Sequence, residues 1–281
     1  MLKKSLMALV GEDIVPIGMQ CFTGNHTLIE VMGAAGFDYV WLDSEHSAVN
    51  PHALEDTMRT CEVAGLVPLV RIPEPTDYTA ARRAVEAGAD GVIVPMVRSP
   101  TDVRNIVNAL TFPPVGERGM CPALRIPGYS VPKLGDYIRH NNSNLLVIPM
   151  IETVEAVEQI DEICAVEQVK LIVFASGELS FAISGGPSPE TSEKLRQAHR
   201  DVVAAAARHG VGLIGGDMFN VTEETLGKAF DEGVSVLCLG IDVMTFRQDC
   251  ERIVAVANAA VAKRTDRHRP AAPPSGFPSL H

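Results

Sequence analysis

The stretch Leu146-Val147-Ile148-Pro149-Met150-Ile151-Glu152-Thr153 is an apolar run that ends abruptly in a carboxylate. Its length fits one strand buried on both faces, and the following segment, 154–163, has the pattern of a helix. A carboxylate at the carboxyl end of a buried parallel strand lies where α/β folds place their functional groups. An apolar run followed by a charged residue recurs along the chain, with Asp43, Arg71 and Glu178 as the charged residues.

Short apolar runs of this kind recur along the chain, and five of them follow a glycine that can take the left-handed conformation closing a helix. These glycines are Gly36, Gly65, Gly88, Gly210 and Gly233. We expect strands at 17–22, 37–42, 66–70, 91–94, 145–151, 171–174, 211–214 and 234–239, each followed by a helix. Regular alternation of this number predicts an α/β fold of the closed (β/α)8 TIM-barrel type.

Three helices combine a capping residue with an apolar face. They are Asn50-Pro51 with Leu54, Met58 and Cys61; Ser99-Pro100 with Val103, Ile106, Val107 and Leu110; and Asp242 with Phe246, Cys250, Ile253 and Ala257.

We expect one barrel domain over 1–262. The proline-rich segment 111–144 between strands four and five is predicted as a long loop, a lid or partner contact. The tail 263–281 is predicted to be disordered.

Composition bounds the function. The chain has 281 residues, 46% of them apolar, and a formal net charge of −11. That charge argues against nucleic-acid or anionic-membrane surfaces, which need basic patches. The six cysteines form no C-x-x-C pair, and the sequence contains no signal peptide pattern and no apolar stretch of membrane-spanning length. We therefore expect a cytoplasmic protein with reduced thiols.

The chemically capable residues lie at the predicted strand ends. Glu152 and Glu178 follow neighbouring strands and are the expected ligands of a divalent metal ion, with helix-start acids as the simpler alternative. His46 is the expected general base, oriented by Asp43, and a polar loop residue is its alternative. Arg71 is expected to stabilise an oxyanion or bind a carboxylate, against the alternative of a buried structural ion pair.

Two further observations concern positively charged residues. Arg118, on the segment 111–144, is a weaker site candidate, and a solvated surface arginine is its alternative. No lysine lies at the carboxyl end of a predicted strand. Schiff-base and pyridoxal-phosphate chemistry need a lysine in the barrel mouth, so both are disfavoured.

The chain also resembles the HpcH/HpaI aldolases, the metal-dependent class II pyruvate aldolases, from about residue 16 to 247. The resemblance rests on Phe37-Asp38 through Asp43-Ser44-Glu45-His46, Val70-Arg71, Val94-Pro95-Met96-Val97, Pro113-Pro114-Val115-Gly116-Glu117-Arg118-Gly119, Ile151-Glu152-Thr153 and Gly177-Glu178-Leu179-Ser180. Two positions depart from the family pattern: Glu178 stands where aspartate is usual, and Met150 stands where many members carry glutamine. Both departures suggest an altered substrate or reaction.

The resemblance implies a barrel in which Glu152 and Glu178 bind Mg²⁺ or Mn²⁺ and pyruvate chelates the metal. It implies that Arg71 stabilises the enolate and that His46, supported by Asp43, is the acid and base. Main-chain amides near Ser176 and Gly177, together with Arg71, would bind the substrate. It also implies a homo-oligomer, a trimer or a hexamer, with the last helix exchanged between subunits.

The leading hypothesis is a divalent-metal-dependent carbon–carbon lyase that cleaves or forms 4-hydroxy-2-keto acids from a 2-keto acid and an aldehyde. One alternative is an acyl-CoA lyase of the citrate lyase β-subunit-like type, although no basic patch for the nucleotide stands out. Another is a barrel that has lost turnover and binds a keto acid or a partner.

Overall fold

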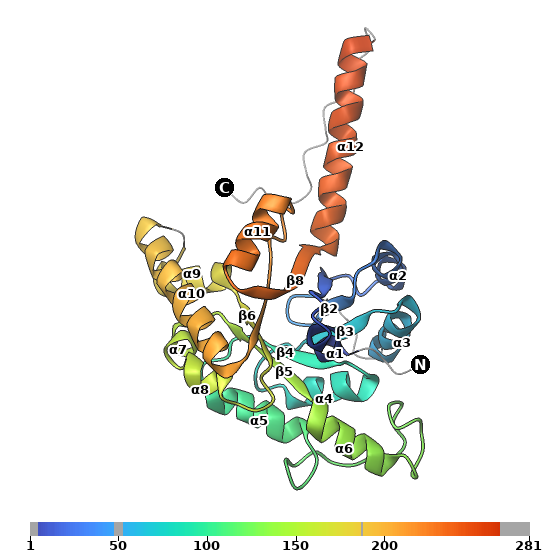
Figure 1. Cartoon of the computed structure of the whole chain (residues 1–281). Helices are drawn as coiled ribbons and strands as arrows, with labels where there is room; N and C mark the ends of the chain where they lie inside the picture. The colour runs from blue at the N-terminus through green and yellow to red at the C-terminus, as the bar shows by residue number, and fades with distance from the viewer. Residues whose placement is uncertain (1–4, 48–52, 187, 265–281) are drawn as a thin grey trace. The chain divides into compact units, whose positions relative to one another are not determined.

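Eight parallel strands form a closed barrel in which the strands follow their sequence order and β1 closes on β8 (Figure 1). The structure, a computed structural model, describes residues 5–47, 53–186 and 188–264. The strands are β1 Ile17–Cys21, β2 Tyr39–Asp43, β3 Val67–Arg71, β4 Gly91–Val94, β5 Leu146–Ile151, β6 Leu171–Phe174, β7 Gly212–Gly215 and β8 Val234–Ile241. The predicted (β/α)8 barrel is therefore confirmed.

Helices follow every strand. They are α1 Leu6–Gly11, α2 His26–Ala35, α3 Leu54–Ala64, α4 Tyr78–Ala87, α5 Pro100–Leu110, α6 Leu134–Asn144, α7 Val154–Glu158, α8 Ile160–Cys164, α9 Ser176–Ser184, α10 Pro189–His209, α11 Glu223–Asp231 and α12 Asp242–Arg264. The five glycines expected to close helices all have positive φ. Ser99 caps α5 in a capping box with Asp102. The predicted cap at Asn50 and Pro51 lies outside the described residues.

Side chains alternate along each strand between the barrel interior and the layer under the helices. Trp41 of β2 belongs to the interior cluster, whereas its neighbour Val40 packs under the helices. Because the period of a strand is two, the next interior position on β2 is Asp43. The same alternation puts Arg71 on β3 and Glu152 just after β5 at the carboxyl end of the interior. Backbone geometry thus brings three predicted site residues to one mouth.

Helix α1 closes the opposite, amino-terminal end of the barrel. Leu6 and Leu9 are buried in the interior cluster. The main-chain N–H of Leu6 donates to the Asp90 carboxylate at 2.9 Å, directly before β4. The sequence pattern does not predict this helix, because its apolar run is too short to identify a structure on its own. Its two leucines add to the apolar packing of the barrel interior.

Tyr39 fills the interior beside β1. Its ring is fully buried, and its hydroxyl donates to the carbonyl of Leu237 at 3.0 Å. A Cβ atom at Gly18 would lie 2.3 Å from Cζ of this ring, well inside contact distance. Glycine is therefore required at position 18 by the volume of Tyr39. Burial raises the pKa of the Tyr39 hydroxyl well above its usual value, so it stays protonated as a donor.

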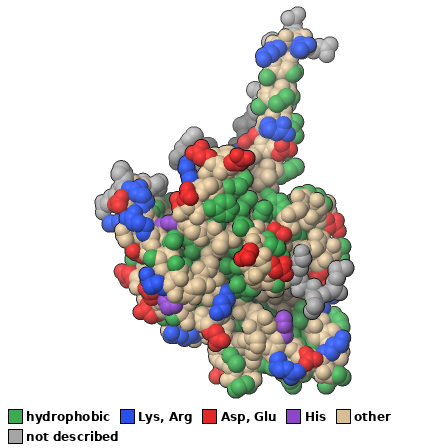
Figure 2. All heavy atoms as spheres, viewed as in Figure 1, with side chains coloured by type: hydrophobic (Ala, Val, Ile, Leu, Met, Phe, Trp, Pro, Cys, Tyr) green, Lys and Arg blue, Asp and Glu red, His purple; other side chains and the backbone are tan. Residues whose placement is uncertain are grey.

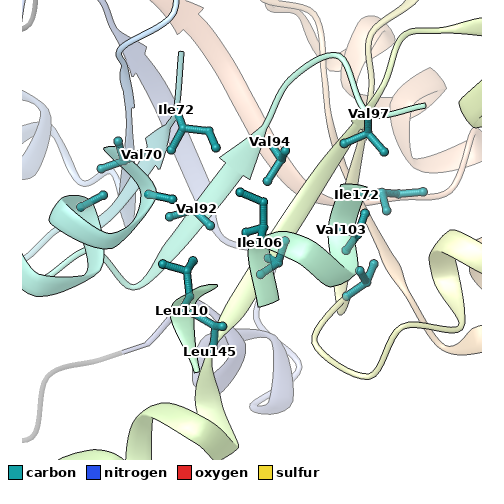
Figure 3. Packing of buried hydrophobic residues seen from close by; sticks show 14 of the residues in the cluster. Val70, Ile72, Val92, Val94, Val97, Val103, Ile106, Leu110, Leu145 and Ile172 are labelled. Carbon is teal, nitrogen blue, oxygen red and sulfur yellow. The ribbon is translucent and has the colours of Figure 1, made fainter. Parts of the chain in front are cut away.

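The layer between barrel and helices is apolar. On α5, Val103, Ile106 and Leu110 recur at helical spacing and are fully buried. They belong to one apolar cluster with Val92 and Val94 of β4 and Leu145, the residue before β5 (Figure 3). This match between a helix stripe and the outer face of a strand holds α5, and with it the β4–α5 turn, against the barrel.

The segment 111–144 joins the end of α5 to the start of β5, so it lies at the amino ends of the strands and does not cover the carboxyl-end mouth. Arg118 is 3% exposed. It donates to Oδ1 of Asn141 at 3.0 Å and to the hydroxyl of Tyr137 at 2.7 Å, and its guanidinium stacks 4.5 Å from the Phe112 ring. Arg118 is thus neither a site residue nor a solvated surface arginine; it anchors this segment to α6. The partner-contact alternative stays a prediction.

The chain divides into two compact units, 1–242 and 243–281. The first contains the barrel. In the second, α12 is one continuous helix to Arg264, and it carries the apolar residues that predicted it. The barrel-domain boundary at residue 262 and the disordered tail remain predictions, and nearly all of that tail lies beyond the described residues.

Replacing Arg118 with alanine is expected to lower the free energy of unfolding by about 3 kcal/mol. The change leaves the Tyr137 hydroxyl and the Asn141 amide oxygen buried without their donor. Chemical denaturation measures the loss. Arg139→Ala removes an exposed guanidinium paired with Asp136 and is expected to cost less than about 0.5 kcal/mol. Equal losses in the two variants would contradict the anchoring role.

Candidate active site

Arg71 is held at the mouth of the barrel by two acids. Strand register pairs it with Asp43, and both Nε and Nη2 of Arg71 donate to Oδ2 of that aspartate. Nη1 lies 3.0 Å from Oε2 of Glu45. Arg71 is 5% exposed and Asp43 is fully buried, and the guanidinium lies 5.7 Å from the centroid of the Trp41 ring. The buried ion pair considered for Arg71 is present, and it fixes the guanidinium at the mouth.

His46 lies beside Glu45 rather than beside Asp43. Its Nε2 is 3.7 Å from Oε2 of Glu45. Asp43 instead accepts, through Oδ1, the main-chain N–H of His46 at 2.7 Å. A short aspartate commonly bonds the backbone a few residues further on, which corrects the expectation that Asp43 orients the imidazole. Asp43 fixes the turn that carries His46, and Glu45 is the carboxylate next to the ring.

Glu152 is fixed by the turn that follows β4. Its carboxylate is buried, and Oε1 accepts the main-chain N–H of Met96, a residue with a φ of 50°. The adjacent Thr153 caps α7, and its hydroxyl donates to the carbonyl of Val97 at 2.7 Å. The ends of β4 and β5 are therefore tied together by two side chains. This arrangement holds one oxygen of Glu152 in place.

Glu178 lies in the first turn of α9 and lines the same pocket as Glu152, a hollow of about 630 Å³. Ser176 and Gly177 are the first two residues of α9 and are exposed. The first N–H groups of a helix have no intrahelical acceptor, and the positive end of the helix dipole lies there. The start of α9 therefore offers both a carboxylate and main-chain donors beside the pocket.

The acids of the mouth influence one another. Burial is the main cause that raises the pKa of Glu152, with a further rise from Glu178 and Glu45 and opposing effects from the Met96 N–H and Arg71. The pKa of Glu45 is raised as well, chiefly by burial and also by Asp43 and Glu178, against Arg71 and His46. The structure thus brings the predicted acids, His46 and Arg71 into one electrostatic cluster in which a bound cation would be stabilised.

The donor set fits a divalent cation of the Mg²⁺ or Mn²⁺ type. Among the described residues, no group of three or more histidine, cysteine, aspartate or glutamate side chains is arranged to hold a metal. Glu152 and Glu178 face one pocket and provide the carboxylate oxygens that hard cations prefer. Two protein ligands leave the other coordination positions open to water and substrate oxygens, as in catalytic sites that use Mg²⁺.

Met150 lies on β5 two residues before Glu152. Its sulfur is 3.8 Å from Nη1 of Arg71, and its side chain is buried in the barrel interior. A thioether is a weak acceptor that accommodates irregular spaces. Met150 therefore gives the guanidinium of Arg71 a weakly polar contact, whereas Asp43 and Glu45 are its strong acceptors.

Two residues of the site were given no role from the sequence. Glu45 contacts both Arg71 and His46, and its place in Asp43-Ser44-Glu45-His46 was the available signal. Arg98 lines the pocket beside Glu152. No sequence feature marks it, because it lies four residues beyond β4 in a turn whose course depends on hydrogen bonds to distant residues.

One face of the molecule shows how its charged side chains are distributed. On the face shown in Figure 2, lysine and arginine side chains are scattered among aspartates and glutamates. Within the described part of the chain, no helix is both long and apolar enough to cross a membrane.

Comparisons with known proteins show that the chain is similar to several aldolases. The chain is 27% identical over 244 residues to the 2-dehydro-3,6-dideoxy-6-sulfogluconate aldolase of Pseudomonas putida, covering 86% of this chain and 92% of that protein. It is 26% identical over 250 residues to the hydroxypyruvate/pyruvate aldolase of Sagittula stellata, covering 89% and 92%. The structure of an HpcH/HpaI aldolase from Desulfitobacterium hafniense superimposes with a TM-score of 0.82 at 25% identity, covering 95% and 99%.

A family model also matches most of the chain. The model for HpcH/HpaI aldolase/citrate lyase covers residues 17–249, a span that holds every residue of the mouth described above. The fold and the lyase class expected from sequence are confirmed by these likenesses together with the closed barrel. The chain belongs to the HpcH/HpaI aldolase/citrate lyase family.

Proposed function

We propose that this protein is a divalent-metal-dependent carbon–carbon lyase that cleaves or forms 4-hydroxy-2-oxo acids, with pyruvate and an aldehyde as the two halves. The observation that carries the proposal is the placement of Glu152 and Glu178 on one pocket. Mg²⁺ or Mn²⁺ held by the two glutamates would supply Lewis-acid polarisation of the 2-oxo group.

For cleavage, the protein must stabilise the negative charge that develops, bind the substrate carboxylate and transfer protons. The 4-hydroxyl loses its proton and the C3–C4 bond breaks. The electron pair of that bond passes to the pyruvyl half, and C4 leaves as the carbonyl carbon of an aldehyde. Arg71 is assigned to the negative charge that develops on the 2-oxo oxygen, since its guanidinium is already oriented by Asp43. The main-chain N–H groups of Ser176 and Gly177 are assigned to the substrate carboxylate.

His46 is assigned to proton transfer. An imidazole can act as a general acid or base, and Nε2 of His46 lies 3.7 Å from Oε2 of Glu45. In cleavage the ring takes the hydroxyl proton, and a proton returned to C3 completes pyruvate. Asp43 is a positioning residue for both Arg71 and the His46 turn.

The cytoplasmic location and the trimeric or hexameric homo-oligomer remain predictions that accompany this function. Light scattering of the purified protein checks the second. The names of two relatives point to different substrates, a sulfogluconate derivative in one and hydroxypyruvate or pyruvate in the other.

Exchange of the pyruvate methyl protons in D₂O, followed by NMR, tests this function without any aldehyde. We expect exchange that depends on Mg²⁺ or Mn²⁺ and stops with EDTA. Glu152→Gln is expected to slow it by at least about a hundredfold, since a ligand carboxylate is lost. Glu155→Gln removes a glutamate from the same pocket that is not an expected ligand, and it should keep most of the exchange. Metal-independent exchange in the wild type would overturn the proposal.

The raised pKa of Glu152 predicts a pH effect on metal-free stability. A carboxyl whose pKa is raised by folding adds stability while it is protonated, and that stability is lost as pH rises through the folded-state pKa. In EDTA, the melting temperature of the wild type should therefore fall as pH rises from about 4 to 7 relative to that of Glu152→Gln. Parallel curves for the two proteins would contradict the assigned pKa shift.

A further inference from the structure

Arg98 is a positive charge in a pocket that also holds three glutamates. The hollow that contains Glu152 and Glu178 is also lined by Glu155 and by Arg98, the only cation among its described lining residues. Arg98 is exposed, and its guanidinium makes no ion pair within the described residues, Glu155 included. Among the residues that line this pocket, Arg98 is therefore the one that can pair with an anionic group of a ligand.

The backbone under Arg98 is fixed. Its N–H donates to Oδ2 of Asp102 at 2.9 Å, and its carbonyl accepts from Nε2 of Gln159 at 3.0 Å. The two residues before it are bonded to the ligand-bearing end of β5, Met96 to Glu152 and Val97 to Thr153. Arg98 therefore starts from a position set by the same hydrogen bonds that set Glu152, which is how rigid binding residues are built.

We propose that Arg98 is a specificity-determining residue that binds a second anionic group, at the aldehyde-derived end of the substrate. This inference rests on the function proposed above, in which the 2-oxo acid end lies at Glu152 and Glu178. The other end then extends into the remaining pocket, where Glu155 disfavours an anion and Arg98 is the charge that can accept one. A guanidinium pairs with a carboxylate or a sulfonate through parallel N–H donors.

Binding of 2-oxo acids tests the inference without turnover. Calorimetry with Mg²⁺ compares 2-oxoglutarate and 2-oxoadipate with the uncharged-tail acids 2-oxopentanoate and 2-oxohexanoate. We expect the wild type to prefer a doubly charged acid over its partner and Arg98→Gln to lose about tenfold of that preference. Arg98→Lys should retain part of it. Arg104→Gln removes an exposed arginine of α5 outside the pocket and should change nothing.

Aldol addition of pyruvate separates this inference from the proposed function. With succinic semialdehyde as acceptor, Arg98→Gln should raise KM about tenfold, while KM for butanal and the pyruvate proton exchange stay near the wild-type values. Equal losses with both aldehydes, or no loss with either, overturn the role of Arg98. If the wild type shows no exchange and yet binds doubly charged acids through Arg98, the lyase function fails and the anion site stands. If pyruvate protons exchange but the wild type shows no preference for doubly charged acids, the lyase function stands and the anion site at Arg98 is ruled out.

Discussion

The ion pair between Arg71 and Asp43 is the interaction on which the mouth of this barrel depends. Both side chains are buried, so removing either partner would leave an uncompensated charge in the interior. The pair also reaches outward, because Asp43 accepts the His46 N–H and Arg71 contacts Glu45. Strand register sets the pair, since residues 43 and 71 are opposite one another on β2 and β3. The charged mouth is therefore positioned by the backbone of the barrel itself.

Much of this could be predicted from sequence, for a physical reason. A period of two along buried strands decides which residues face inward, so Asp43, Arg71 and Glu152 were expected at one end from the runs that precede them. Their convergence needs only the closed barrel. The choice between Asp43 and Glu45 as neighbour of the imidazole of His46 could not be predicted, because it depends on which nearby donor the short aspartate reaches.

Other features depend on contacts that no local pattern encodes. Arg118 is buried by Tyr137 and Asn141, about twenty residues further along the chain, so its sequence context could not distinguish an anchor from a surface residue. The segment that carries it connects a helix to a strand, which places it at the amino ends of the strands. The two ends of the barrel therefore differ: α1 closes one end, and the other end carries the charges.

The fit between Tyr39 and Gly18 has a consequence for how this barrel can diverge. The aromatic ring occupies the volume that any side chain at position 18 would need, and its hydroxyl is committed to a carbonyl on β8. A larger side chain at position 18 therefore requires a smaller one at position 39. In descendants of this chain, positions 18 and 39 would have to be substituted together, because a larger residue at position 18 would clash with Tyr39.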